Sequence, residues 1–137
     1  MILADTSAWI EYDRATGSAV DHRIAHLIAS DGPLAVTQPI VMEIVAGARD
    51  ERRQADLTRL LERFPLRRLD ADVDFTSAAQ IYRQCRSVGV TPRGLIDCVL
   101  VAVAWRHADA ILSCDVDLDR VCGVMGVPLD PASLRAR

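Results

Sequence analysis

Four carboxylates end or interrupt apolar segments of this chain, and they constrain its structure more than any other feature. They are Asp5, after the apolar run 1–4; Glu43, within 39–47; Asp97, within 95–101; and Asp115, after 110–114. A buried, unpaired carboxylate is costly and tends to take up a proton. One such residue could be a satisfied core acid. Four of them, at strand ends or on the apolar face of a helix, indicate a shared divalent cation.

The composition is that of a small globular protein. The chain has 137 residues, half of them apolar, so we expect a single domain over 1–137 with one hydrophobic core. The most apolar helix is bounded or interrupted by Arg93, Asp97 and Arg106, so no membrane span is expected, and the N-terminus lacks the features of a signal peptide. The four cysteines form no Cys-x-x-Cys pair, which favours reduced core thiols in a cytoplasmic protein.

The charge pattern narrows the function classes. A net charge of −3 argues mildly against a general nucleic-acid binder, although part of the acid excess could belong to a metal site. All 16 basic residues are arginine. Arginine suits bidentate phosphate contacts, but a GC-rich genome would produce the same bias. The absence of lysine excludes Schiff-base chemistry, P-loops and receiver domains.

Strands and helices are predicted to alternate along the chain. Short apolar runs between turn signals predict strands over 2–5, 34–36, 66–69, 110–113 and 127–129. Helices are predicted from Thr6, over 18–29, from Pro39 to about Gly47, over 52–64, from a cap at Asp72 or Asp74 to Gly89, over 95–107 and over 116–124. This alternation predicts an α/β fold with a mostly parallel central sheet flanked by helices on both faces.

The predicted elements bring the four acids towards one edge. Asp5 and Asp115 each follow a strand, so they should share the carboxyl edge of the sheet, where sites of α/β proteins form. Asp97 falls in the first turn of its helix, where the helix dipole favours an anion. Glu43 lies on an apolar helical stripe. The two helices could therefore direct their carboxylates at the edge that carries Asp5 and Asp115.

An all-carboxylate site has a characteristic chemistry. Hard oxygen ligands without histidine or cysteine favour Mg²⁺ or Mn²⁺ over Zn²⁺. Such a site activates water and neutralises a phosphate, which indicates phosphodiester hydrolysis. The alternative is that each acid is a helix cap or an ion-pair partner. Arg93, for example, stands four residues before Asp97 and could pair with it.

Four segments that contain these acids resemble PIN-domain ribonucleases, and more narrowly the VapC toxins of bacterial toxin–antitoxin pairs. They are Leu-Ala-Asp-Thr-Ser-Ala-Trp-Ile (3–10), Val-Met-Glu-Ile-Val-Ala-Gly-Ala (41–48), Arg-Gly-Leu-Ile-Asp-Cys-Val-Leu-Val-Ala (93–102) and Ile-Leu-Ser-Cys-Asp-Val-Asp-Leu (111–118). The resemblance covers nearly the whole chain, in order and with similar spacing. Leu118 is a departure, because an aromatic residue is common there, but the position is one of packing.

The resemblance implies a PIN-like α/β/α sandwich and a Mg²⁺-dependent endoribonuclease, with Mn²⁺ as a substitute ion. The family's catalytic acids fall on Asp5, Glu43, Asp97 and Asp115. We expect Asp5, Asp97 and Asp115 to bind the metal. The family's small hydroxyl residue falls on Thr6 or Ser7, and Asp117 could hold a metal-bound water or cap the following helix. The resemblance also implies a homodimer and inhibition by a cognate antitoxin.

Two further surfaces are candidates for partners. A basic cluster, Arg49, Arg52 and Arg53, follows the Glu43 helix, and Arg67 and Arg68 form a second. Such clusters are usually solvated surface, but near the acidic edge either could hold RNA phosphates. The apolar first helix carries Trp9, Ile10 and Tyr12, and we expect part of it to meet an antitoxin segment. The rival interpretations are a PIN nuclease of RNA maturation without an antitoxin, and a non-catalytic PIN-fold interaction domain.

Overall fold

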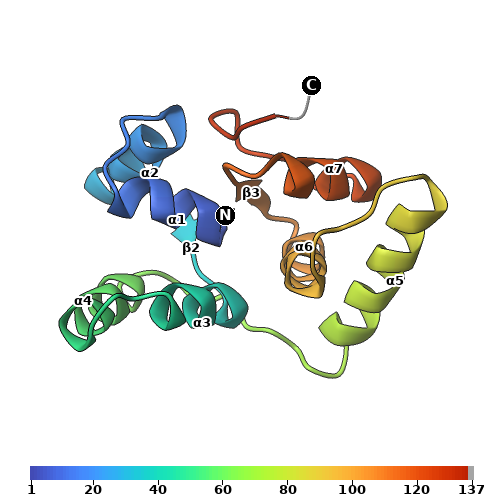
Figure 1. Cartoon of the computed structure of the whole chain (residues 1–137), viewed down its shortest axis with the longest axis horizontal. Coiled ribbons are helices and arrows are strands. Elements are labelled where there is room, and N and C mark those ends of the chain that lie inside the picture. Colours follow the sequence, from blue (N-terminus) through green and yellow to red (C-terminus); the bar gives the residue numbers. More distant parts are fainter. Residues whose placement is uncertain (136–137) are drawn as a thin grey trace.

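A computed structural model describes residues 1–135, in which short parallel strands lie at the centre and helices surround them (Figure 1). The strands are β1 (Ile2–Ala4), β2 (Leu34–Ala35) and β3 (Ala110–Leu112), in the order β2-β1-β3. Both pairs are parallel, with Leu3 opposite Ala35 on one side and Ile111 on the other. The predicted parallel sheet is confirmed.

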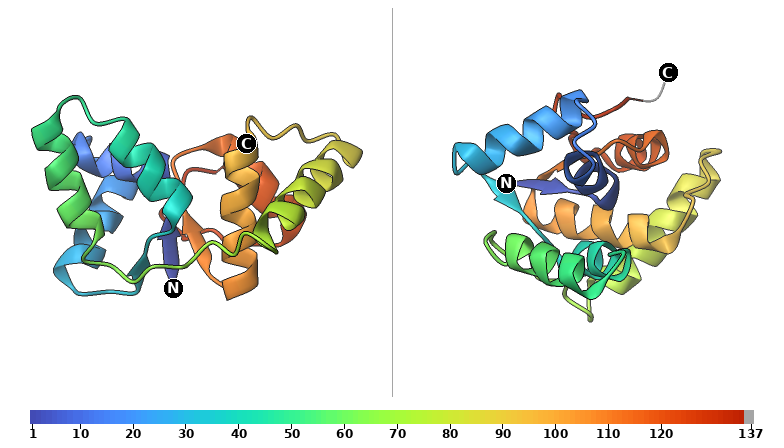
Figure 2. Two further views of the ribbon diagram at one scale, coloured as in Figure 1. Left: turned by 90° about the horizontal axis from the view of Figure 1, so that it is seen from below. Right: turned by 60° about the vertical axis from the view of Figure 1, so that its left-hand side comes forward.

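Helices cover both faces of this sheet. They are α1 (Thr6–Asp13), α2 (Ala19–Ala29), α3 (Gln38–Ala46), α4 (Glu51–Leu61), α5 (Asp74–Ser87), α6 (Leu95–His107) and α7 (Val116–Met125). In the right-hand view of Figure 2, α2 lies above the strands and α6 lies below them. The fold is therefore α/β with helices on both faces, as the alternation of elements predicts.

Two of the predicted strands are reduced to single bridges at the sheet edges. Leu66 pairs only with Val36, and Leu129 pairs only with Ile111. Both segments directly follow or contain a proline, at 65 and 128, whose missing N–H prevents the ladder from extending. The predictions of strands over 66–69 and 127–129 are therefore wrong in extent, although each segment lies beside the expected strand.

The predicted central helix is the core of the molecule. Residues 98–104 of α6 are all buried, and β1 and β3 pack in the same apolar cluster. In residues 1–135 no helix combines the length and apolarity needed to cross a membrane. Three of the four cysteines, Cys85, Cys98 and Cys122, are buried in this core, and Cys114 is half-buried; all four are free thiols, as expected.

The start of α5 differs from its prediction. The N-cap is Val73, which has no side chain able to cap, and neither Asp72 nor Asp74 fills that role. Asp74 is instead the first helical residue, 1% exposed, and its carboxylate accepts from the Arg106 guanidinium at 2.8 and 2.9 Å. The buried ion pair ties α5 to the end of α6, which explains why an acid begins the helix.

Arg67 belongs to the structure rather than to an RNA-binding surface. Its guanidinium donates to both oxygens of Asp109, at 2.7 and 3.0 Å, and Asp109 is 1% exposed. The N-terminal ammonium of Met1 is 2.8 Å from the same carboxylate. Of the second basic pair, only Arg68 has an exposed side chain free for phosphates. The interpretation of Arg67 as a phosphate-binding candidate is therefore wrong.

Candidate metal centre

The carboxyl ends of β1 and β3 bring two of the four acids to one edge of the sheet. Ala4 is opposite Leu112, so the residues that follow the two strands leave the sheet side by side. The Asp5 backbone nitrogen donates to Leu112 O at 3.0 Å, which extends the pairing to the acid itself. Asp115 follows three residues after β3. The two acids share this edge, as their positions in the sequence predict.

Asp5 is 5% exposed and is fixed by three hydrogen bonds. Ser7 Oγ and the Ala8 backbone nitrogen donate to Oδ1, at 2.7 and 2.9 Å, so the carboxylate also caps α1. Ser113 Oγ donates to Oδ2 at 2.7 Å. Burial raises the pKa of Asp5 above its ordinary value, against the effect of these hydrogen bonds, and the charge of Asp115 raises it further. The acid is rigid, and its charge is costly without a cation.

Glu43 and Asp97 reach the same edge from two helices. Glu43 is half-buried in the second turn of α3, and Thr6 Oγ1 donates to its Oε1 at 2.9 Å. Asp97 lies in the first turn of α6, and within residues 1–135 its carboxylate has no hydrogen bond or ion pair. Burial first, and then the charges of the other three acids, raise the pKa of Asp97 to about 6, with Arg93 opposing them.

Asp115 is the acid with a basic partner. Its Oδ1 accepts from the Asp117 backbone nitrogen at 2.9 Å, so the cap of α7 is Asp115 and not Asp117. Its Oδ2 accepts from the Arg93 guanidinium at 2.5 Å. The Asp117 carboxylate lies between Arg93, at 3.3 Å, and Arg120, at 2.7 Å. Arg93 therefore pairs with Asp115 and Asp117 rather than with Asp97, its neighbour four residues along.

All four acids line one cavity of about 340 Å³, which we call the acidic cavity. Thr6, Ser7 and Arg93 line it as well. Both of the predicted supporting hydroxyls are thus engaged, Thr6 with Glu43 and Ser7 with Asp5. The structure brings together Asp5, Glu43, Asp97 and Asp115, which lie in four separate parts of the sequence.

The donor set fits a hard divalent cation. It consists of carboxylate oxygens, one of which, on Asp115, is already held by a cationic guanidinium, and the Asp97 carboxylate has no partner among the described residues. In residues 1–135 no three acid, histidine or cysteine side chains converge closely enough to enclose an ion as they stand. A bound ion would therefore need these side chains to lie closer together than they do here.

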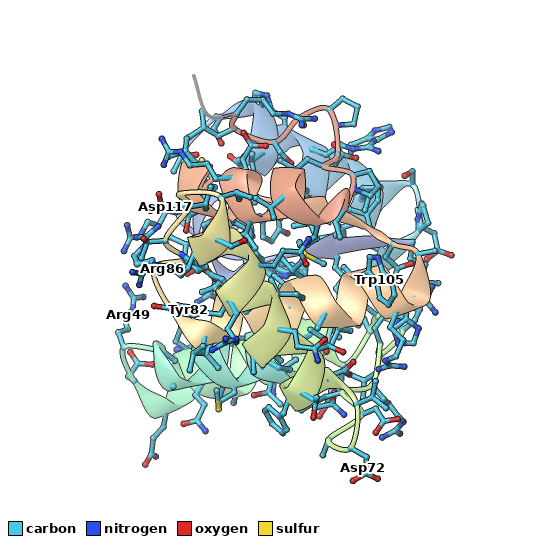
Figure 3. All side chains as sticks on the ribbon, turned by 90° about the vertical axis from the view of Figure 1, so that its right-hand side faces the viewer. Arg49, Asp72, Tyr82, Arg86, Trp105 and Asp117 are labelled. Carbon is cyan, nitrogen blue, oxygen red and sulfur yellow. The ribbon has the colours of Figure 1, made fainter. Side chains whose placement is uncertain are left out.

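The predicted phosphate-binding arginines lie beside a second cavity. Arg49 and Arg53 line a larger cavity of about 660 Å³, whereas Arg52 is exposed and lines neither. Arg53 is ion-paired with Asp13, and Arg49 is 85% exposed. Figure 3 shows Arg49 and Asp117 along the left edge of the molecule, with Trp105 toward the right of the same view.

This larger cavity, which we call the α1–α4 groove, adjoins the acidic cavity. Its apolar lining comes from α1, α3 and α4 and includes Trp9, Ile10, Tyr12, Ile44, Leu57 and Leu60. Thr6 and Glu43 line both cavities, so the groove reaches Glu43 and lies next to the acidic cavity. The first helix thus exposes part of its apolar surface, with Ile10 41% exposed.

Sequence reasoning missed two residues of the site. Ser113 Oγ donates to Asp5 and accepts from the Asp115 backbone nitrogen at 3.0 Å, so it links the two acids. Its signal was a hydroxyl residue at the very end of a strand, two residues before an acid. For Arg93 the sequence suggests only a pairing with Asp97, because residues four apart are neighbours on a helix. It precedes α6, however, and the helical rule does not apply to it.

Comparison with known proteins identifies the class of protein that has this fold. The PIN domain family matches residues 2–124. The chain belongs to the PIN-domain family. Among characterised relatives, a VapC ribonuclease of Mycobacterium bovis, Mb1587, is 40% identical over 136 residues, which is 98% of this chain and all of that protein. By this similarity over its whole length, the chain is an endoribonuclease of the VapC type.

Solved structures agree on the fold. The crystal structure of VapBC2 from Rickettsia felis, bound to a promoter DNA fragment, contains a chain that superposes with a TM-score of 0.74 at 15% identity, covering 95% of this chain and 98% of that one. A toxin–antitoxin complex from Klebsiella pneumoniae gives a TM-score of 0.71 at 17% identity, covering 98% and 100%. At these identities the likeness concerns the fold alone.

Proposed function

We propose that this protein is the toxin of a type II toxin–antitoxin pair and that it hydrolyses RNA at the acidic cavity with a divalent cation, Mg²⁺ by preference and Mn²⁺ as a substitute. The observation that carries this proposal is the meeting of Asp5, Glu43, Asp97 and Asp115 in one cavity. Named relatives with 40% identity are ribonucleases, which supports RNA as the substrate. RNA is met in the cytoplasm, where we expect the protein to act.

In this proposal Asp5, Asp97 and Asp115 hold the metal, and Glu43 acts on the water. A bound divalent cation supplies activation of the attacking water and neutralises charge on the phosphodiester. Glu43 is held at Oε1 by Thr6, which leaves Oε2 to accept a proton from that water. Ser7 and Ser113 keep Asp5 in one orientation. Asp117 stays outside the metal ligands and holds Arg93 near the edge.

The RNA backbone would run past the acids towards Arg49. Arg49 is 85% exposed and lines the groove beside Glu43. Arg53 is less available because Asp13 holds its guanidinium. Arg52 could contact phosphates further from the cleaved bond. These contacts would orient the strand without reading its sequence.

The α1–α4 groove is our candidate for the antitoxin. Its apolar lining suits an amphipathic segment, and its opening onto Glu43 would let a basic side chain of that segment reach the acids. A clustered negative field attracts a guanidinium and a metal ion alike, so antitoxin and Mg²⁺ should compete. Structural neighbours that contain a toxin with its antitoxin support a partner of this kind.

The homodimer implied by the family remains part of the proposal. Trp105 on α6 is 61% exposed, on the side of the molecule away from the acidic edge, and such a large apolar side chain is a natural interface residue (Figure 3). Light scattering of the purified chain tests the oligomeric state, and Trp105→Gln tests this face. A monomer at micromolar concentration would remove the dimer from the proposal.

Induction of the chain alone, and of Asp97→Asn at matched protein level, tests the function as a whole. We expect growth arrest and RNA cleavage with the wild-type chain, neither with the variant, and rescue by the small gene next to it. Mapping of RNA ends after brief induction gives the substrate. Cleavage without toxicity in the native host would favour RNA maturation instead, and equal cleavage by both proteins would reject the site.

A further inference from the structure

Arg93 lines the acidic cavity with an anchored backbone and an exposed side chain. Its neighbour Pro92 is buried, and Gly94 begins α6 as its N-cap, so the backbone is anchored on both sides. The side chain is 64% exposed. Among residues 1–135, Arg93 is the one basic residue that lines the acidic cavity. The long, cationic side chain of Arg93 thus lies at the entrance of the cavity that the four acids line.

The Arg93 guanidinium occupies the Asp115 oxygen that a metal would bind. Asp115 Oδ1 caps α7 by accepting from the Asp117 backbone nitrogen, so Oδ2 is the oxygen left for a cation. Arg93 donates to that Oδ2 at 2.5 Å and also lies 3.3 Å from Asp117 Oδ2. A metal that binds Asp115 must therefore take this oxygen from Arg93. The guanidinium then has Asp117 as its remaining acid partner, and it is repelled by the ion beside it.

We propose that Arg93 exchanges partners during the reaction cycle: it neutralises Asp115 when the acidic cavity holds no metal, and it binds a phosphate of the RNA once a divalent cation occupies Asp115 Oδ2. This inference rests on the proposed function. The phosphates of RNA are anionic, and the four carboxylates of the acidic cavity would repel them in the absence of nearby cations. A released guanidinium at its mouth provides two parallel donors that match phosphate oxygens.

The chain offers a matched control for this residue. Arg120 is also exposed and is also ion-paired with Asp117, at 2.7 Å, but it does not line the acidic cavity. Arg93→Gln and Arg120→Gln therefore remove the same charge and an ion pair to the same carboxylate. Only the first removes a cation from Asp115. Both side chains are largely exposed, so both variants should fold, which thermal melting checks.

The first measurement is calorimetric titration of Mg²⁺ into the full chain without RNA. Arg93→Gln should bind Mg²⁺ about two- to fivefold more tightly than the wild type, since that is the range of an exposed ion pair that no longer competes. Arg120→Gln should bind as the wild type does. Equal or weaker Mg²⁺ binding by Arg93→Gln than by Arg120→Gln would overturn the proposed exchange at Asp115.

The second measurement is fluorescence anisotropy of a labelled, single-stranded RNA of mixed sequence, with each variant combined with Glu43→Gln to prevent cleavage. With Mg²⁺ present, Arg93→Gln should weaken RNA binding about tenfold, as expected for charge-assisted hydrogen bonds, and Arg120→Gln should not. The slope of log K against log salt should fall by about 0.7, the value for one phosphate contact on a single strand. Without Mg²⁺, the loss caused by Arg93→Gln should disappear.

Arg93→Lys separates charge from geometry. It should keep the salt slope and recover only part of the affinity, because an ammonium contacts phosphate as a point charge. Equal RNA binding by Arg93→Gln and Arg120→Gln in Mg²⁺, with Glu43→Gln inactive, would overturn this inference and leave the proposed function standing. Wild-type cleavage by Glu43→Gln would instead count against the proposed function.

Discussion

Ser113 Oγ lies 2.7 Å from Asp5 Oδ2 and 3.0 Å from the backbone nitrogen of Asp115. One buried hydroxyl therefore connects the two acids that follow neighbouring parallel strands. It donates to Asp5 and accepts from the backbone nitrogen of Asp115, so both its donor and its acceptor capacity are used at the acidic edge of the sheet. Ser7 Oγ, 3.3 Å away, completes a small network around Asp5.

Ser113→Ala should lower metal affinity about tenfold, the effect typical of a residue that orients a metal ligand. It should also cost about 1–3 kcal/mol of stability, because the buried Asp5 carboxylate loses a donor and the Asp115 nitrogen loses its acceptor. Mg²⁺ calorimetry and urea unfolding measure the two effects. Ser133→Ala is the control: Ser133 Oγ accepts from the Ser113 nitrogen at 3.1 Å and touches none of the four acids. It should lose stability only, and a matching loss of metal affinity would contradict the orienting role of Ser113.

Asp97 should make the metal-free protein less stable as pH rises. Its pKa is raised from 3.8 to about 6 in the folded state, so the folded chain holds the proton more tightly than the unfolded chain. Stability without metal therefore falls as pH increases through this window. In EDTA, Asp97→Asn should melt at a higher temperature than the wild type above pH 6. The difference should close below pH 4.

Thermal melts from pH 4 to 8 check this, with the exposed Asp72→Asn as control. A constant difference between Asp97→Asn and the wild type across the whole range would show that the effect does not come from this ionisation.

Millimolar Mg²⁺ should raise the melting temperature, because the ion binds only where the four acids are assembled. At ten times the dissociation constant the gain is about 1.4 kcal/mol, or roughly 4–6 °C for a chain of this size. Mn²⁺ should act similarly, and Asp97→Asn should respond far less. Differential scanning fluorimetry with matched ionic strength gives the answer. Equal shifts in the wild type and the variant would mean that the ion binds elsewhere.

Ile10→Arg should impair neutralisation by the antitoxin. Ile10 lines the α1–α4 groove and is 41% exposed, so an arginine there would obstruct an apolar segment and place a charge against it. A central contact of this kind is worth about 2 kcal/mol in binding. Affinity for the purified antitoxin, measured by biolayer interferometry, is the test. Val88→Arg, at an exposed apolar position outside the groove, is the control; equal weakening by both would place the antitoxin elsewhere.

Arg67→Ala should destabilise the fold and leave RNA binding unchanged. Burial raises the pKa of Asp109, but the hydrogen bonds and charges of Arg67 and the N-terminus bring its net value below 3.8. This stabilisation is present above pH 3.8 and is lost as pH falls through the folded-state pKa. Loss of the buried pair should cost about 3 kcal/mol at pH 7. Urea unfolding measures it, and Arg68→Ala should change little.

The sequence by itself predicts most of the fold and the acid set. Parallel strands carry their carboxyl ends to one edge, so topology places a residue at or shortly after a strand end. The positions of Asp5, directly after β1, and of Asp115, three residues after β3, are predictable for that reason. The position of Asp97 is predictable because it stands in the first turn of an apolar helix that packs on the sheet, so its carboxylate lies near the sheet edge. The two edge bridges were overestimated as strands because a local pattern does not show how many partners a segment will find.

Only the tertiary structure decided how the acids are held and which cation faces them. Ser113 and Asp5 are 108 residues apart, and Arg93 and Asp115 are 22 apart, so no periodicity relates either pair. The same fold pairs Arg67 with the buried Asp109 and leaves Arg93 exposed at the acidic cavity, although both are arginines in loop segments. Side-chain partners depend on which surfaces meet once the strands are paired. The sequence alone determined that the four acids would approach one edge of the sheet. The packing of α6 and α7 against that edge decided which side chains they contact.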